Sequence, residues 1–179
     1  KVDVLMIGGG MANTFLKAKG YEMGTSLVED DKTELALEIM AHAEKLGKKL
    51  LIPVDVTVAT AIDAPETAQT VAADQVPADR MALDIGPETV KIYQDAVMNA
   101  KTILWNGPMG VFEVDAFAVG TFAVAHAVAK SPAYSIVGGG DSVASLERTG
   151  LNDEIDHIST GGGASLEFLE GKKLPGVEV

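Results

Sequence analysis

Short apolar runs alternate with longer stretches of helically spaced apolar residues over most of the chain. This alternation is typical of βα repeats, whose strands lie parallel in one sheet. We therefore predict an α/β fold, with a Rossmann-like, doubly wound and mainly parallel sheet flanked by helices in three layers (α/β/α). The runs that predict strands are 2–7, 49–56, 102–105, 134–137 and 155–159.

Helical periodicity predicts helices between and after these runs. Leu35, Ile39 and Ala43 share one face of the first helix, and Pro87 suits the first turn of another. Residues 57–86 show no clear period, and we expect a few short strands there. No linker rich in Ser, Gly or Pro interrupts the pattern, so the whole chain is interpreted as one domain. The predicted helices are 31–46, one that starts at 86–88, 117–130, 141–148 and 163–170.

Three of the predicted strands lead into a glycine triplet that is followed by a helical pattern. The triplets are Gly8–Gly10, Gly138–Gly140 and Gly161–Gly163. Glycine lets a ligand approach the backbone closely, and the first N–H groups of a helix have no partner within it. A helix N-terminus also carries a partial positive charge, which favours phosphate. Three such turns at strand ends predict a polyphosphate site.

Asp141 and Ser142 follow the second triplet, at the expected start of a helix. Both residue types are favoured N-caps, so a structural capping role is one interpretation. In the other interpretation, the Asp141 carboxylate holds Mg²⁺ while the Ser142 hydroxyl and the neighbouring amides bind phosphate oxygens. The two roles are compatible, because one residue can cap a helix and bind a ligand.

A second candidate segment, Trp105–Glu113, contains a predicted strand end, two glycines and a proline. One interpretation of this segment is a structured turn. The alternative is a nucleoside pocket, in which Val111 and Phe112 contact the base and the Glu113 carboxylate accepts hydrogen bonds from ribose hydroxyls. An acidic residue that contacts a ribose is well precedented in dinucleotide-binding folds.

The chain is strongly acidic, with 14 Lys and Arg, 26 Asp and Glu, and a net charge of −12. Such a surface repels nucleic acid and anionic membranes, so we expect neither as a partner. Phosphate must then be held by amides, by a divalent cation or by basic groups elsewhere in the protein. The absence of cysteine fits a cytoplasmic location. Within the 179 residues we find no membrane-length apolar segment, signal peptide, Gly-x-x-x-x-Gly-Lys loop or Gly-x-Gly-x-x-Gly fingerprint.

Five ordered blocks stand out: 7–12 (IGGGMA), 83–87 (LDIGP), 105–113 (WNGPMGVFE), 138–142 (GGGDS) and 159–164 (STGGGA). Together they resemble the C-terminal, nucleotide-binding domain of phosphoglycerate kinase, over essentially the whole chain. The resemblance implies reversible phosphoryl transfer between 1,3-bisphosphoglycerate and MgADP, which gives 3-phosphoglycerate and MgATP. Phosphoryl transfer depends mainly on positioning and charge neutralisation, which suits a site of amides and one metal ion.

Carried over by position, the resemblance also implies a role for each part of the site. The first triplet and Leu83 would flank the adenine, Glu113 would bind the ribose, and the third triplet would lie beside the transferring phosphoryl group. The implied nucleotide-binding residues are Gly8, Gly9, Gly10, Ala82, Leu83, Asn106, Pro108, Val111, Glu113, Gly139, Gly140, Asp141 and Ser142. The implied catalytic residues are Gly161, Gly162 and Gly163, and Asp141 is the implied Mg²⁺ ligand.

The sequence departs from the family pattern in several places. Ala82 stands where family members usually carry Gly, and Ser142 stands where Thr is common. The family's N-terminal domain, which binds the phosphoglycerate, is absent, as is the Gly-Ala-Lys strand expected before Lys1. We therefore expect a monomeric fragment that lacks the first strand of its own domain, binds MgADP or MgATP weakly and is inactive alone. Two other classes stay open, a dinucleotide-binding oxidoreductase domain and a non-catalytic nucleotide-binding module.

Overall fold

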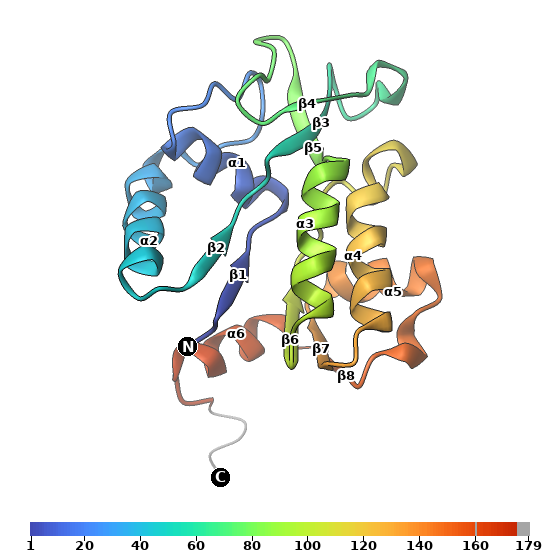
Figure 1. Cartoon of the computed structure of the whole chain (residues 1–179). Coiled ribbons are helices and arrows are strands. Elements are labelled where there is room, and N and C mark those ends of the chain that lie inside the picture. Colours follow the sequence, from blue (N-terminus) through green and yellow to red (C-terminus); the bar gives the residue numbers. More distant parts are fainter. Residues whose placement is uncertain (160, 175–179) are drawn as a thin grey trace.

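The strands form three separate sheets in the computed structural model, which describes residues 1–159 and 161–174 (Figure 1). The strands are β1 (Val4–Met6), β2 (Lys49–Leu51), β3 (Asp55–Ala59), β4 (Gln69–Ala72), β5 (Met81–Ile85), β6 (Thr102–Asn106), β7 (Tyr134–Gly138) and β8 (His157–Ser159). Strands β1 and β2 pair in parallel, as do β6, β7 and β8 in that order. The third sheet, in the order β4–β3–β5, is antiparallel.

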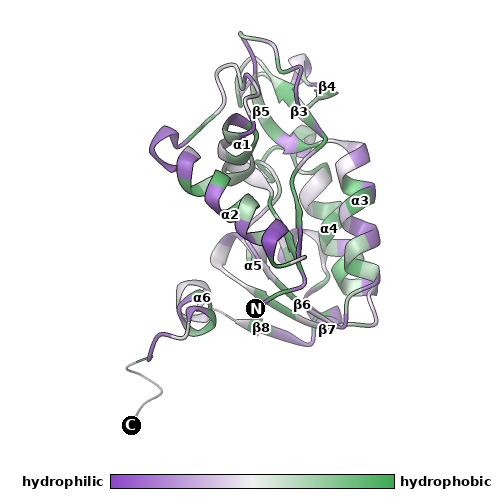
Figure 2. Ribbon diagram, turned by 60° about the vertical axis from the view of Figure 1, so that its left-hand side comes forward, coloured by the Kyte–Doolittle hydropathy of each residue, from purple (hydrophilic) through white to green (hydrophobic). Residues whose placement is uncertain are grey.

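The helices cover the sheets, and all but α6 connect strands of the parallel sheets or lead into them. They are α1 (Gly9–Ala18), α2 (Thr33–Lys45), α3 (Pro87–Met98), α4 (Val119–Lys130), α5 (Gly140–Thr149) and α6 (Gly162–Glu170). Short 3₁₀ turns lie at Asp30–Lys32, Pro65–Thr67, Asp115–Phe117 and Asn152–Glu154. Helices α1 and α2 pack on each other, and α3 packs along α4 (Figure 1). Figure 2 shows α2 with hydrophilic and hydrophobic turns interleaved, whereas α4 is mainly hydrophobic, as its nearly continuous apolar sequence predicts.

The α/β class, with parallel sheets flanked by helices, is confirmed. The antiparallel sheet is formed by residues 55–85, largely the segment that shows no clear period in the sequence. The short strands expected for this segment are present as β4 and β5. Its edge strand β4 is mostly exposed and β5 contains the buried Asp84, so these strands lack the long apolar runs of a fully covered parallel sheet.

The prediction of one continuous strand over 49–56 is wrong, because β2 ends at Leu51 and β3 begins only at Asp55. Pro53 lies between them and has no N–H to offer a sheet ladder. The N–H groups of Val54 and Asp55 donate instead to the Thr89 hydroxyl, at 3.0 and 3.2 Å. The chain therefore leaves the β1–β2 sheet at this point and enters the antiparallel one.

Asp55 also fixes the start of α3. Its buried carboxylate accepts the N–H groups of Glu88 and Thr89, at 3.0 and 2.8 Å, and the Thr89 hydroxyl at 2.6 Å. These bonds satisfy N–H groups that the first turn of a helix leaves without a partner. A residue distant in sequence thus caps α3, although Gly86 is the residue at the N-cap position.

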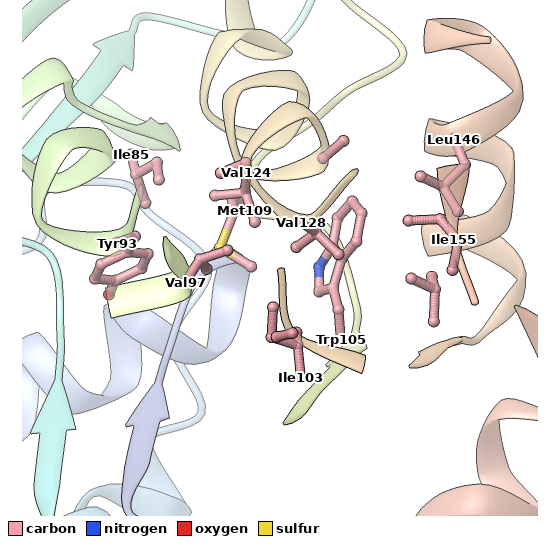
Figure 3. Packing of buried hydrophobic residues seen from close by; sticks show 14 residues of the cluster. Ile85, Tyr93, Val97, Ile103, Trp105, Met109, Val124, Val128, Leu146 and Ile155 are labelled. Atoms are coloured by element: carbon pink, nitrogen blue, oxygen red, sulfur yellow. The ribbon is translucent and has the colours of Figure 1, made fainter. Parts of the chain in front are cut away.

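The main core lies between α3, α4, α5 and the β6–β7–β8 sheet (Figure 3). The Trp105 ring of β6 lies between Val128 of α4 and Leu146 of α5, and its indole N–H donates to the Gly107 carbonyl at 2.6 Å. Side chains of this size contribute about 1.5–3 kcal/mol each when they are fully buried. The core therefore fixes the end of β6 and the first residues of the segment that follows it.

Strands β1 and β6 each have one edge without a strand partner in the described part of the chain. The segments that follow the two strands meet where the Gly9 N–H donates to the Met109 carbonyl at 2.9 Å. Three apolar side chains on these strands are 37–39% exposed, namely Val4, Leu5 and Leu104. The single parallel sheet predicted from the sequence is therefore divided between β1 and β6.

Candidate functional site

Each glycine triplet supplies the N-cap of a helix. Gly8, Gly139 and Gly161 are the N-caps of α1, α5 and α6, and among the described residues no side chain forms a cap hydrogen bond to these helices. The capping interpretation of Asp141 is therefore wrong, since this residue lies in the first turn of α5, after the N-cap. Gly139 has a φ of 93°, a conformation that glycine adopts without strain. Uncapped N–H groups at a helix start are suitable for binding an anion.

The second and third triplets lie in direct contact. The parallel register places Gly138 opposite both Asn106 and Ser159, so three strand ends meet at one level. A Cβ on Gly162 would lie only 2.5 Å from the Gly139 Cα and 2.6 Å from its N atom. The side-chain amide of Asn106 also donates to the Gly162 carbonyl at 3.4 Å. The N-termini of α5 and α6 thus lie side by side.

The first triplet contacts the site through the segment of residues 106–113, which we call the glycine loop. The Gly9 N–H donates to the Met109 carbonyl at 2.9 Å, and the Gly9 backbone approaches the Pro108 carbonyl. A Cβ on Gly8 would lie 2.4 Å from the Met109 sulfur. The glycine loop therefore lies between the N-terminus of α1 and the other two helix N-termini.

The glycine loop is held by two buried hydroxyl groups. The Gly107 N–H donates to the Ser142 Oγ at 2.6 Å. The N–H groups of Met109 and Gly110 donate to the Thr121 Oγ1, at 3.0 and 3.2 Å. Both hydroxyl-bearing residues are fully buried. The loop is thus a structured turn, while its use as a nucleoside pocket, and phosphate binding by the Ser142 hydroxyl, stay predictions.

The predicted adenine-side residues on β5 lie beside the glycine loop. The Val111 N–H donates to the Leu83 carbonyl at 2.9 Å, and the Val111 side chain packs on the cluster of Ala59, Leu83 and Phe117. The Ala82 N–H donates to the Ser26 hydroxyl at 2.8 Å. The structure thus brings Leu83 to Val111, as a shared site of the 83–87 and 105–113 blocks requires, whereas Ala82 packs on a separate cluster that contains Leu16 and Met23.

The acidic residues of the site, Glu113 and Asp141, are exposed. Within residues 1–159 and 161–174, neither side chain has an ion-pair partner or a hydrogen bond. The same residues contain no group of three or more His, Cys, Asp or Glu side chains that could hold a metal. A single free carboxylate still fits Mg²⁺, which in nucleotide sites is bound by one or two carboxylates together with the phosphates.

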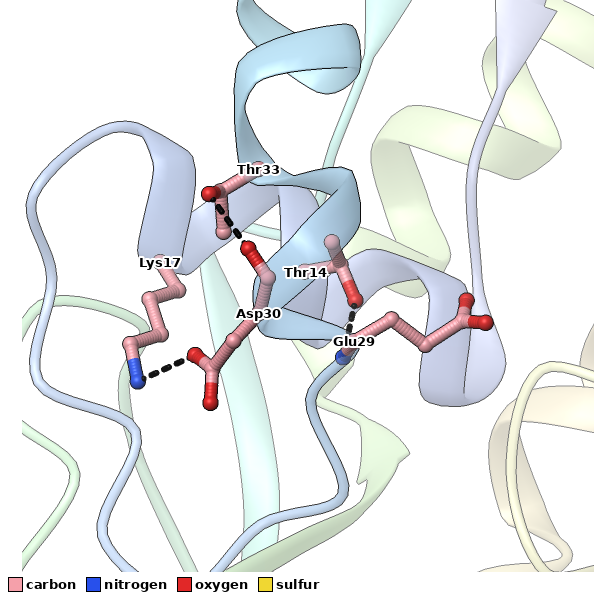
Figure 4. A network of polar contacts seen from close by, with 5 residues as sticks. All are labelled: Thr14, Lys17, Glu29, Asp30 and Thr33. Carbon is pink, nitrogen blue, oxygen red and sulfur yellow. Dashed lines mark hydrogen bonds and ion pairs between the residues drawn. The ribbon is translucent and has the colours of Figure 1, made fainter.

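Sequence reasoning missed Leu27, whose side chain is 76% exposed beside Gly10. The segment around it is fixed to α1: the Asn13 side chain donates to the Leu27 carbonyl at 3.2 Å and the Glu29 N–H to the Thr14 hydroxyl at 3.1 Å. An ion pair of 2.8 Å between Lys17 and Asp30 completes this network (Figure 4). A lone leucine in a polar segment carries no periodic signal, so only the fold reveals its position.

Asp84 is the site's buried ionisable group. It is 4% exposed, and its carboxylate accepts the Gly120 N–H at 2.7 Å and the Ile85 N–H at 2.9 Å. Burial raises the pKa of Asp84 to about 7, while these two backbone hydrogen bonds lower it.

A groove of about 490 Å³ lies elsewhere, between the antiparallel sheet and the first turns of α3 and α4. Thr57, Gln69, Pro87 and Val119 are among its lining residues, and none of the predicted site residues lines it. The groove is therefore separate from the N-termini of α1, α5 and α6, where the predicted site residues lie.

The fold is α/β, and the N-termini of α5 and α6 meet at the ends of parallel strands. The family profile described as phosphoglycerate kinase matches residues 1–172, and the chain belongs to the phosphoglycerate kinase family. It is 60% identical over 177 residues to a phosphoglycerate kinase of Moorella thermoacetica and 58% identical over 177 residues to one of Clostridium novyi. These alignments cover 99% of this chain but only 45% and 44% of the relatives, so the chain spans less than half of their length.

The solved structure of phosphoglycerate kinase from Coxiella burnetii superposes with a TM-score of 0.93 at 48% identity, over 96% of this chain and 45% of that one. A phosphoglycerate kinase structure from Pyrococcus horikoshii gives a TM-score of 0.77 at 38% identity, over 97% and 44%. The fold is therefore that of part of a phosphoglycerate kinase. No helix within residues 1–159 and 161–174 has the length and hydropathy needed to cross a membrane.

Proposed function

We propose that this chain is the C-terminal, nucleotide-binding part of a phosphoglycerate kinase and that it binds MgADP and MgATP. The observation that carries the proposal is the contact of Gly139 with Gly162, which brings two uncapped helix N-termini together at the ends of parallel strands. The chain has a charge of −12, so long-range attraction of a nucleotide by basic side chains is not available. Backbone N–H groups and a metal ion supply the positive charge instead.

The intact protein transfers a phosphoryl group from 1,3-bisphosphoglycerate to the terminal phosphate of ADP, which gives 3-phosphoglycerate and ATP, and also runs in reverse. The first-turn amides of α5 bind the nucleotide phosphates, and the amides at Gly161–Gly163 stabilise the charge on the group in transfer. Asp141 is the protein ligand for Mg²⁺, which when bound neutralises phosphate charge. Each of these residues acts by positioning or by charge, and none forms a covalent bond.

The nucleoside lies between the first triplet, β5 and the glycine loop. Leu83 and Val111 form an apolar wall for the adenine, with Ala82, Gly8–Gly10 and the exposed Leu27 around it. Glu113 accepts hydrogen bonds from the ribose hydroxyls. Asn106 and Pro108 shape the loop, through the contacts of Asn106 with Gly162 and of Pro108 with Gly9.

The other substrate binds to a part of the family's protein outside these 179 residues, since the chain spans only 45% of the relatives. A further strand belongs between β1 and β6, where two sheet edges have no strand partner among residues 1–159 and 161–174 and three apolar side chains are partly exposed. With that strand in place, the two parallel sheets become one doubly wound sheet between two layers of helices. Alone, the chain binds nucleotide but does not catalyse phosphoryl transfer.

The family match favours this function over the two alternatives. A dinucleotide-binding oxidoreductase domain would bind NAD, which saturation-transfer NMR detects. A non-catalytic module, in which the glycines serve only packing, would bind MgADP no more weakly after Asp141→Ala or Glu113→Ala.

Isothermal titration calorimetry of the folded chain with MgADP tests the proposal. We expect saturable binding of one nucleotide that weakens when the metal is removed with EDTA, and no heat with NAD. A folded chain that binds no MgADP would contradict the proposal. Turnover of 3-phosphoglycerate and MgATP by the chain alone would contradict the assignment of the second substrate to another part of the protein.

A further inference from the structure

Asp84 is a buried carboxylate that the proposed phosphoryl transfer does not use. Its Oδ2 accepts the Gly120 N–H at 2.7 Å, and its Oδ1 accepts the Ile85 N–H at 2.9 Å. Gly120 lies in the first turn of α4, whose first residue is Val119. The carboxylate therefore joins β5 to the N-terminus of α4, where the helix dipole favours a negative charge.

The same turn of α4 holds the glycine loop. Thr121, the next residue after Gly120, accepts the N–H groups of Met109 and Gly110 at 3.0 and 3.2 Å. Gly110 also packs directly on Asp84, since a Cβ on Gly110 would lie 2.4 Å from the Asp84 Oδ1. The loop backbone is thus fixed from two sides, by the Thr121 hydroxyl and by contact with the carboxylate.

We propose that Asp84 is a positioning residue for nucleotide binding: its carboxylate holds the first turn of α4, and through Thr121 the glycine loop, in the shape that presents Val111 and Glu113 to the nucleotide. This inference rests on the proposed nucleotide site. Asp84 itself does not contact the ligand, and its effect on affinity is transmitted by the loop backbone.

Protonation of Asp84 weakens its two backbone hydrogen bonds and so changes the shape of the first turn of α4, although it also removes the cost of burying the charge. One carboxyl oxygen then becomes a hydroxyl donor, so the group cannot accept both the Gly120 and the Ile85 N–H groups equally well. Burial raises the pKa of this carboxyl to about 7, so the change falls near neutral pH. Nucleotide affinity that depends on the ionised carboxylate is therefore lost as the pH falls through about 7.

No cation on the packed elements offsets this burial. The charged or titratable side chains on β3, α1, the first turn of α3, the glycine loop and α4, together with the 3₁₀ turn before α4, are Asp55, Lys17, Glu88, Glu113, Asp115, His126 and Lys130. Among these only Asp55 is buried, and its carboxylate is bonded to the start of α3. Lys17 is exposed and paired with Asp30 at 2.8 Å. Asp115 is paired with Arg148 at 2.8 Å.

The test compares Asp84→Asn with Asp55→Asn, measuring MgADP affinity of the 179-residue chain by calorimetry between about pH 6 and pH 8. Asp55 is a matched control, because it is similarly buried and bonds the start of α3 without contacting the glycine loop. Near pH 8 we expect Asp84→Asn to bind MgADP about fivefold more weakly than the wild type. As the pH falls toward 6, the MgADP affinity of the wild type should decrease further, whereas that of Asp84→Asn should stay constant. Asp55→Asn should keep the wild-type affinity and pH profile even where it lowers stability.

A second pair of variants tests the link through Thr121. Thr121→Ser keeps the hydroxyl that accepts the Met109 and Gly110 N–H groups, whereas Thr121→Val removes it. We expect Thr121→Ser to retain the affinity for MgADP and Thr121→Val to lose it. Equal affinities for the two variants would contradict transmission through this hydroxyl.

Amide hydrogen exchange in the wild type gives a readout that needs neither nucleotide nor a variant that folds. The protection factor of the Gly120 N–H should fall as the pH rises through about 7, because an opening that exposes Asp84 is easier when the buried carboxyl is ionised, while that of the Glu88 N–H, which bonds to Asp55, should not. If this exchange pattern is observed but the chain does not bind MgADP, the proposed function is refuted while the attachment of Asp84 to α4 is not. A Gly120 protection factor that is independent of pH, or a wild-type pH profile in Asp84→Asn, would overturn the role of Asp84.

Discussion

The contact between the second and third triplets predicts a large effect of one methyl group. In Gly162→Ala, the new Cβ would lie 2.5 Å from the Gly139 Cα and 2.6 Å from the Gly139 N. Carbon atoms in favourable contact lie roughly 3.5–4 Å apart, so the backbones must separate by about 1 Å. Both neighbouring atoms belong to the backbone and cannot rotate away, so the change resembles overpacking of a core, which costs about 1–3 kcal/mol.

The same separation moves the N-terminus of α6 away from that of α5 and widens the phosphate site. We expect Gly162→Ala to lower the free energy of unfolding by about 1–3 kcal/mol and to weaken MgADP binding about tenfold or more. Denaturant unfolding measures the first quantity and calorimetry the second.

Gly138→Ala is the matched control, because its Cβ would meet its nearest neighbours at 3.7–3.9 Å, which is ordinary contact. We expect this variant to stay within about 0.5 kcal/mol of the wild type and to keep its affinity for MgADP. Equal stabilities of the two variants would show that the two triplets do not touch. Destabilisation by Gly162→Ala without loss of affinity would show that the contact is structural only.

Three further predictions concern charged groups. Asp141→Asn should weaken MgADP binding about tenfold, which is equivalent to roughly 1.4 kcal/mol. The weaker binding of metal-free ADP, measured in EDTA, should not change. Calorimetry with and without Mg²⁺ measures both affinities. Glu113→Gln should reduce the preference for ADP over its 2′,3′-dideoxy analogue in competition binding, and an unchanged preference would argue against a ribose contact. The pKa of Asp84 in the folded chain, about 7, lies above the ordinary value of 3.8 for this carboxyl, so the folded chain binds the additional proton. The Asp84 contribution to stability therefore falls as pH rises between these values, by about 4 kcal/mol in total. The free energy of unfolding, plotted against pH over this range, should have a shallower slope for Asp84→Asn than for the wild type. Equal slopes for the two proteins would contradict a raised pKa of Asp84.

The parts of the molecule that follow from local sequence were predictable. Glycine triplets after apolar runs indicated helix starts at strand ends, and α5 and α6 begin within one residue of the predicted positions. Helix 117–130 was predicted from a nearly continuous apolar sequence, and α4 is accordingly packed in the core. The break at Pro53 could also have been found, because proline is rare inside a strand.

Contacts between segments distant in sequence could not be predicted. The Ser142 hydroxyl binds the Gly107 N–H, 35 residues away, so the local motif that suggested a phosphate ligand says nothing of this bond. The position of Leu27 beside Gly10 depends on bonds between its segment and α1. Asp84 lies in the 83–87 block, but its partner Gly120 is 36 residues further along, so the local sequence does not reveal this bond.

The central claim is that the N-termini of α5 and α6 converge to bind the phosphates of one Mg-nucleotide. Titration of the ¹⁵N-labelled chain with MgADP, followed by the backbone amide shifts, tests it most directly. We predict saturating shifts with one common affinity at Gly139–Asp141 and at Gly162–Gly163, with smaller shifts at Val111 and Leu83. Shifts confined to the groove lined by Thr57 and Gln69, or to only one of the two triplets, would contradict the claim.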